Sequence, residues 1–223
     1  MNQYTYVANQ AAVSVNQVLR KTYALLSLTV LFSAVVVALT LYGFLPLPRQ
    51  GLLINLLLTY GLLFLVQACR HTRFALFLIF AFTGYLGYTL TPFLAACLVE
   101  FSNGAAIIGT AFVGTIAVFL SLSLYAIVSK KDFSYLGGWL VAATVVTMLS
   151  VFAAFFLQVG IGALVIDAAL MLISSGWILY DTSRIVRGGE SDYVMLTVCL
   201  FISFYNLFVT ILDILSHFAG RRN

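Results

Sequence analysis

The sequence contains little charge and few cysteines, and each shortage excludes a class of protein. Only 8% of its 223 residues are charged, against about 25% in a soluble globular domain. Such a low fraction excludes a soluble protein. The three cysteines, Cys69, Cys97 and Cys199, form no Cys-x-x-Cys pair and fall at different depths of the apolar runs described below. A disulfide framework is therefore not expected.

Long apolar runs make up most of the chain, which is 63% hydrophobic. Such runs favour transmembrane helices, which satisfy their own backbone in lipid, over a barrel of short alternating strands. A span needs about 20 apolar residues, and the runs are 22–44, 51–68, 74–99, 105–128, 135–157, 162–186 and 193–218. We therefore predict an all-α integral membrane protein: a polar tail at 1–21, one seven-helix transmembrane bundle at 22–218 and a short tail at 219–223.

Basic residues of the short loops gather on one side of the predicted membrane, where they set the orientation of a membrane protein. That side holds Arg20, Lys21, Arg70, Arg73, Lys130, Lys131, Arg184 and Arg187, and the other only Arg49, Arg221 and Arg222. The asymmetry places the amino end in the cytoplasm and the carboxyl end outside. The pI near 9.0 thus reflects orientation, and no nucleic-acid partner is expected. Within the fourth span, small residues at Ala106, Thr110 and Gly114 predict a packing face.

Three of the seven acids, Asp167, Asp181 and Asp213, fall inside apolar runs. A carboxylate at the centre of a bilayer helix costs roughly 2.5–3.5 kcal/mol on insertion scales, so it marks a functional site by default. If the last two spans form an antiparallel hairpin, residues equally distant from the turn lie at one level. Asp181 then lies near the cytoplasmic end with Ser203 a turn further in. Asp167 and Asp213 share a level near the outer face.

Each acid also has an ordinary interpretation. Asp181 at a helix end either reaches water or pairs with Arg184, one turn on, and Arg187 is a second partner at that end. Asp167 and Asp213 either face each other across the hairpin or rotate outward to the headgroups, because counting fixes a level and not a rotation. His217, four residues after Asp213, lies beside it on the helix. We expect no metal site from so sparse a set.

Several intramembrane enzymes are excluded by missing residues. Tyr180-Asp181 matches the Tyr-Asp of aspartyl proteases, but the following helix has Thr-Ile-Leu-Asp at 210–213 where those enzymes need Gly-x-Gly-Asp. A serine protease needs a Gly-x-Ser motif and a histidine in an adjacent helix, and a retinal protein needs a lysine in the seventh. The histidines lie at helix ends and no lysine follows Lys131. With no phosphate-binding loop or dinucleotide fingerprint either, we expect neither catalysis nor an organic cofactor.

The segment ISSGWILYDTSRIVRGGESDY at 173–193, followed by LFISFYNLF at 200–208, resembles the signature of the Bax inhibitor-1 family. RKTYALLSLTVLFSA, FTGYLGYTLTP and KKDFSYLGG are also similar to that family, so the resemblance spans the chain from Arg20 onward. It implies a seven-helix bundle with the last helix central. The likeness is greatest to the bacterial YccA-like branch, which implies an inner-membrane modulator, both inhibitor and slow substrate, of an FtsH-type membrane protease.

Other members of this family are pH-sensitive calcium leaks, whose mechanism uses one aspartate in the sixth helix and one in the seventh. The first matches Asp181, and the second matches Ser203, two residues before Tyr205 of the Tyr-Asn-Leu-Phe motif. The chain thus keeps one carboxylate of that pair, and a carboxylate with a hydroxyl cannot share a proton as two carboxylates do. The resemblance leaves two functions open: protease modulator, and pH-sensitive calcium or cation leak centred on Asp181. The oligomeric state is open too.

Overall fold

The computed structural model describes residues 2–157, 163–189 and 191–219. Its helices are α1 (Asn2–Leu41), α2 (Leu52–Cys69), α3 (Ala75–Glu100), α4 (Gly104–Ser129), α5 (Leu136–Leu157), α6 (Ala163–Val186) and α7 (Tyr193–Phe218). No strand occurs within these ranges. The seven predicted helices are confirmed, with bounds that differ from the expected ones by a few residues at most, except at the start of α1. Arg221 and Arg222 lie outside the described residues.

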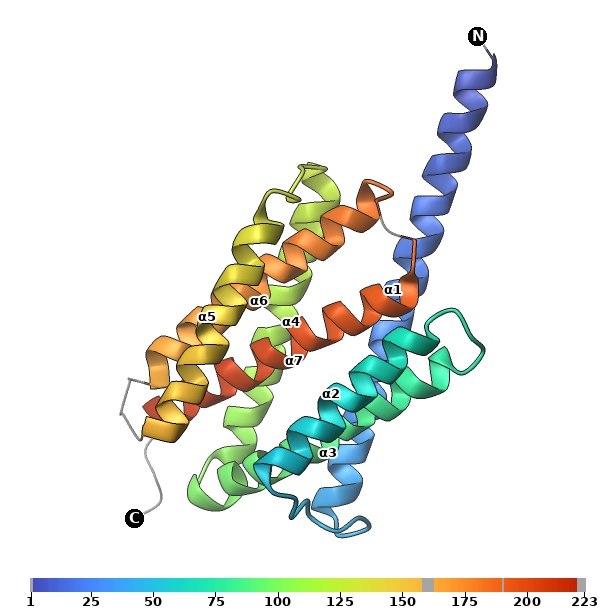
Figure 1. Cartoon of the computed structure of the whole chain (residues 1–223). Coiled ribbons are helices and arrows are strands. Elements are labelled where there is room, and N and C mark those ends of the chain that lie inside the picture. The colour runs from blue at the N-terminus through green and yellow to red at the C-terminus, as the bar shows by residue number, and fades with distance from the viewer. Residues whose placement is uncertain (1, 158–162, 190, 220–223) are drawn as a thin grey trace.

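The first helix begins far earlier than the first apolar run. α1 is 40 residues long, so the predicted polar tail is a helical continuation of the first span. Figure 1 shows the amino-terminal half of α1 projecting away from the other six helices. At 1.5 Å per residue the whole helix is about 60 Å long, twice the roughly 30 Å hydrocarbon core of a bilayer.

The seventh helix packs against α1, α3, α4 and α6, while α2 packs on α3 and α5 packs on α6. More of α7 is buried than of any other candidate span. Its buried residues include Leu196, Leu200, Leu207 and Leu212, which lie on different sides of the helix. These contacts place the residues of α7 within reach of most other elements (Figure 1).

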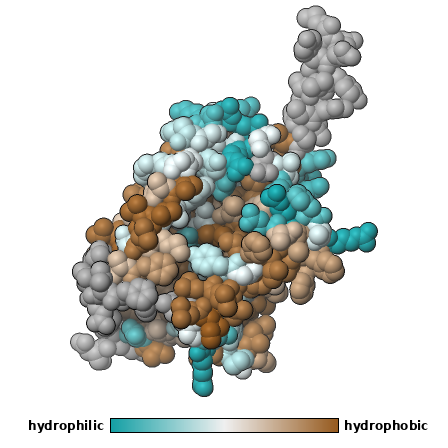
Figure 2. All heavy atoms as spheres, in the orientation of Figure 1, coloured by the Kyte–Doolittle hydropathy of each residue, from teal (hydrophilic) through white to brown (hydrophobic). Residues whose placement is uncertain are grey.

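Three loops meet at one end of the bundle, which we call the basic end. The α2–α3, α4–α5 and α6–α7 loops lie there, and two ion pairs join them: Arg70 Nε lies 3.7 Å from Asp192 Oδ2, and Arg187 Nη1 lies 2.9 Å from Asp132 Oδ2. Figure 2 shows hydrophilic residues gathered over this end. The opposite, or far, end holds the α3–α4 loop and the carboxyl end of α7 (Figure 1). The predicted grouping of the basic loops is therefore present.

The flanks of the bundle are apolar. Large hydrophobic side chains such as Leu57 and Phe64 on α2 and Val146 and Leu149 on α5 are exposed, which in water would be a liability and in a bilayer is lipid contact. Six helices are long and apolar enough to cross a membrane, and α2 is a shorter apolar helix, by length and composition among the described residues. Together these features make the chain a multi-pass membrane protein.

The prediction that Ala106, Thr110 and Gly114 form the packing face of α4 is wrong. Ala106 and Thr110 are exposed, and the buried residues of α4 are Gly104, Ile107, Ala111, Thr115, Phe119, Ser123 and Ala126. Two of the small residues that α4 buries, Ala111 and Thr115, lie one position beyond the predicted Thr110 and Gly114. Because α4 is apolar on every side, spacing alone predicted a stripe without identifying the face that packs.

Candidate functional site

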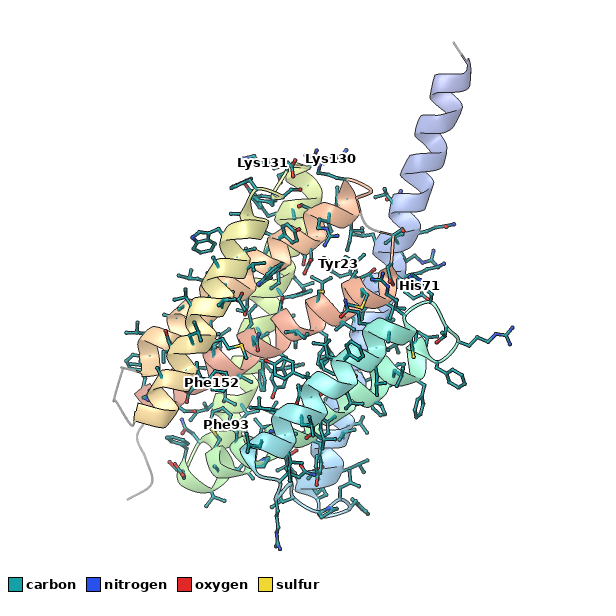
Figure 3. All side chains as sticks on the ribbon, in the orientation of Figure 1. Tyr23, His71, Phe93, Lys130, Lys131 and Phe152 are labelled. Atoms are coloured by element: carbon teal, nitrogen blue, oxygen red, sulfur yellow. The ribbon has the colours of Figure 1, made fainter. Side chains whose placement is uncertain are left out.

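The basic-end half of the bundle encloses a group of polar side chains that we call the inner polar cluster: Tyr23, Ser123, Asp181 and Thr182. The phenol oxygen of Tyr23 on α1 lies 3.0 Å from Thr182 Oγ1 on α6. Asp181 and Ser123 both act electrostatically on that phenol. Figure 3 shows Tyr23 directed into the bundle, between the ribbons of α6 and α7. The cluster therefore joins α1, α4 and α6 through hydroxyl and carboxyl groups.

Asp181 is only 3% exposed, so its carboxyl group lies inside the bundle and not against lipid or water. Two of its neighbours, Thr182 and Ser183, are buried as well. Ser203 on α7 is also buried, and its hydroxyl donates to the carbonyl of Cys199, 3.1 Å away and one turn earlier. The cluster as defined here contains one carboxyl group, in keeping with a serine at position 203.

A second group of acids lies near the far end, where counting along the hairpin placed it. Asp167 on α6 and Asp213 on α7 are close enough to act on each other electrostatically. Asp167 is 8% exposed, which excludes the alternative that it rotates out to the headgroups. His217 Nδ1 lies 3.8 Å from Asp213 Oδ1 and 3.0 Å from the Asp213 carbonyl oxygen. The structure thus brings Asp167, Asp213 and His217 together, and away from Asp181.

A cavity of about 480 Å³ opens beside this acidic pair, between α3 and α7. Glu100, Asp213, Ser216 and His217 supply its polar wall. Cys97 on α3 also lines it, with its sulfur 3.2 Å from the Ser216 hydroxyl. Asp213 is therefore near Asp167 and also lines a polar cavity.

The arginines near Asp181 have other neighbours. The guanidinium of Arg184 lies over the ring of Tyr180, 5.4 Å from its centroid, in a cation–π arrangement. Arg187 pairs with Asp132 across the α4–α5 loop. Hydrogen bonding from Ser134, with the nearby Arg187 charge adding to it, holds the pKa of Asp132 below its usual range.

Two loop acids that the sequence analysis did not single out have structural roles. Asp132 joins two loops, as described above. Asp192 caps α7, because its Oδ1 accepts hydrogen bonds from the backbone N–H groups of Val194 at 3.1 Å and Met195 at 3.3 Å. An aspartate directly before a run of apolar helical residues is a recognisable N-cap signal. The cap fixes where α7 begins and hence the level of every residue on it.

No group of three or more histidine, cysteine, aspartate or glutamate side chains in the described ranges is arranged to hold a metal ion. Neither acid site therefore supplies a ready-made ligand shell. Both sites place carboxyl groups inside an apolar bundle.

The helical bundle has apolar flanks and short loops, and it encloses carboxyl groups between its helices. These features define a polytopic membrane protein, and ionisable groups inside such a bundle mark candidate functional sites. The chain belongs to the Bax inhibitor-1 family: the family's sequence model, described as "Inhibitor of apoptosis-promoting Bax1", matches residues 15–220. The resemblance found in the motifs is therefore confirmed.

Bacterial relatives match almost the whole chain. The "Modulator of FtsH protease YccA" of Escherichia coli K12 is 44% identical over 209 residues, 93% of each chain. The "Inner membrane protein YccA" of E. coli strain CFT073 gives the same identity and coverage. A protein of Pseudomonas aeruginosa is 39% identical over 223 residues, 99% of each chain. The similarity thus extends over the bundle and both acid sites.

Proposed function

We propose that this protein is a modulator of an FtsH-type membrane protease, to which it binds as an inhibitor and slow substrate. The observation that carries the proposal is the 44% identity, over 93% of each chain, to a protein named as a modulator of that protease. The relatives described above are named as a modulator and a membrane protein, which supports a role in binding and not in catalysis.

The shape of α1 supports the same role. Its amino-terminal half continues as a helix past the basic end (Figure 1). The concentration of arginine and lysine at that end favours a cytoplasmic location. A membrane protease that degrades proteins from an exposed end would meet this helix first.

The placement in the membrane is part of the proposal. We assign the protein to the inner membrane, with the amino end in the cytoplasm and the carboxyl end outside. The short α2 crosses as the seventh span, because its 18 residues extend about 27 Å. α7 is then the central helix, which its packing against α1, α3, α4 and α6 supports.

Reconstitution with the protease tests the modulator role. The full chain and an FtsH-type protease are placed in one liposome, and degradation of a second membrane substrate is followed. The full chain should slow that degradation and be consumed slowly itself. Unchanged degradation at a several-fold molar excess of this protein would contradict the proposal.

Deletion of residues 1–16 tests whether the protease engages this protein at the amino-terminal end of α1. The truncated protein should resist turnover, while deletion of 219–223 at the other end serves as the control and should leave turnover unchanged. Equal turnover of the full chain and the chain lacking 1–16 would show that α1 is not where the protease engages.

The second function is a pH-sensitive calcium or cation leak centred on Asp181. One observation favours it: a buried carboxyl group within a polar cluster that joins three helices. Calcium or proton flux through liposomes that contain the purified protein alone separates the two proposals. A modulator carries no current, whereas a leak carries one that Asp181→Asn abolishes.

A further inference from the structure

We propose that the basic end of the bundle carries a binding site for the phosphate headgroup of an anionic phospholipid, between the α2–α3 loop and the start of α7. A cavity of about 420 Å³ opens there, and Arg70, His71, Arg73, Ser191 and Tyr193 lie in its wall. Figure 3 shows His71 in this loop, beside the start of α7. The proposal goes beyond the protease role and does not depend on it.

Positive charge exceeds negative charge around this cavity. Arg70 and Arg73 lie in its wall, and Lys21 on α1 approaches it over the Tyr193 ring, with its Nζ 5.7 Å from the ring centroid. Asp192 is the acid among the described lining residues, and its Oδ2 lies 3.7 Å from Arg70 Nε. Arg73 has no ion-pair partner in the described part of the chain. A basic pocket at the cytoplasmic ends of membrane helices, where we place this end, attracts anionic headgroups.

The guanidinium of Arg70 is held in place on one side. Its Nε donates to His71 Nε2 across 3.1 Å and lies beside the Asp192 carboxylate. Asp192 is fixed in turn, because its Oδ1 accepts hydrogen bonds from the first N–H groups of α7. All of these contacts use Nε, so the two terminal nitrogens of the guanidinium remain for a ligand. Arginine binds phosphate well through two parallel N–H groups.

The third helix begins at the wall of the same cavity and lacks a side-chain cap. Ala75 and Leu76 line the cavity, and no side chain accepts a hydrogen bond at the N-cap, Phe74. The N–H groups of Leu76 and Phe77 have no backbone acceptor among the residues that the structure describes. α7, by contrast, is capped by Asp192. The start of α3 thus adds partial positive charge to the arginines, which favours a phosphate.

Exposed apolar side chains border the cavity and identify the ligand as a lipid rather than free phosphate. Leu76 lines the cavity and is 46% exposed, and its neighbours Phe74 and Phe77 are 70% and 71% exposed. They begin the apolar flank of α3, a candidate membrane span whose exposed side faces acyl chains. A phospholipid holds its phosphate at the border between these chains and water, which is where the cavity lies. The site therefore combines charge for the headgroup with an apolar surface for the chains beneath it.

Native mass spectrometry of the full chain in a neutral detergent tests the proposal, because it counts the lipid molecules that each protein retains. The wild type should bind dioleoylphosphatidylglycerol, which is anionic, more tightly than dioleoylphosphatidylcholine, which is zwitterionic. Arg73→Gln should weaken the phosphatidylglycerol complex about fivefold, the factor expected for one basic residue at a membrane surface. Lys130→Gln is the matched control: it removes the same charge at the same end but lies outside the cavity wall, so it should leave the affinity unchanged.

Two further variants separate the parts of the site. Asp192→Asn should bind phosphatidylglycerol more tightly, because the amide oxygen still caps α7 while Arg70 loses its competing carboxylate. Leu76→Gln should weaken lipid binding by removing apolar contact, and an excess of inorganic phosphate should not displace the lipid from the wild type.

Four results would overturn the proposal: equal affinity for the two lipids, equal losses in Arg73→Gln and Lys130→Gln, weaker binding in Asp192→Asn, or displacement of the lipid by inorganic phosphate. The last would assign the cavity to a free phosphate compound. If Asp192→Asn does not fold, Arg73→Gln and Leu76→Gln still decide, since both of these side chains are exposed.

Discussion

Gly87 of α3 lies directly against the backbone of Ser33 of α1: a Cβ atom built on Gly87 would stand 2.7 Å from the Ser33 carbonyl oxygen. One turn earlier on α3, a Cβ atom on Gly84 would stand 2.7 Å from a ring carbon of Phe32. The two glycines thus let α1 and α3 approach closely, as small residues do between membrane helices. Gly87 faces the backbone of Ser33, which cannot move aside. Gly84 faces the ring of Phe32, which can rotate.

Gly87→Ala should therefore destabilise the protein more than Gly84→Ala. Overpacking against backbone costs typically about 1–3 kcal/mol, while rotation of Phe32 relieves most of the strain at Gly84. Thermal unfolding in detergent measures both. Gly109→Ala on α4, where an added Cβ meets nothing within 4 Å, is the matched control, and equal losses at Gly84 and Gly87 would contradict the geometry.

Cysteine labelling tests the orientation. On a background without Cys69, Cys97 and Cys199, Lys130→Cys should react only with reagent on the cytoplasmic side. Asn103→Cys, in the α3–α4 loop at the far end, should react only from outside. The opposite pattern would mean that the basic loops are not cytoplasmic.

Asp181→Asn should keep the fold and remove any pH response of the inner polar cluster, because an amide still forms hydrogen bonds but does not titrate. Tyr23→Phe is the companion change: it deletes the 3.0 Å contact with Thr182 and should cost about 1 kcal/mol. Flux or a conformational signal in liposomes is measured against pH. A pH response that survives unchanged in Asp181→Asn would rule out this residue as the sensor.

The exposed ion pair between Asp132 and Arg187 predicts a small loss of folding stability at acid pH. Since the folded pKa of Asp132 is lowered, its contribution is present above the unfolded pKa and is lost as pH falls through the folded pKa. Asp132→Asn should flatten the unfolding profile at acid pH only. High salt should weaken the same contribution in the wild type, and a profile insensitive to both changes would show that the pair adds no stability.

The positions of the helices were predictable because lipid imposes the length of an apolar run. The run 193–218 became α7 with the same bounds, Tyr193–Phe218. The extension of α1 was not predictable in this way, since residues 1–21 are polar and carry no membrane signal. The packing face of α4 was missed because a helix that is apolar all round has no side that its sequence distinguishes.

The acid sites, too, were predictable from the sequence only in part. The level shared by Asp167 and Asp213 followed from counting residues away from the hairpin turn, but their rotation toward each other needed three-dimensional packing. Tyr23 and Thr182 are 159 residues apart, and hydroxyl groups in apolar helices are common enough to raise no signal. Only charged residues carry a cost that makes them visible in such a sequence.

The unbroken course of α1 gives the protein a mechanical property. A flexible tail absorbs a pull as slack, whereas a helix of 40 residues transmits it along its axis to the part that packs on α3, α7 and α6. Any motor that grips the amino end then shears α1 along α3, where Gly84 and Gly87 interlock with Phe32 and Ser33. That contact would have to give way before α1 could be drawn out of the bundle.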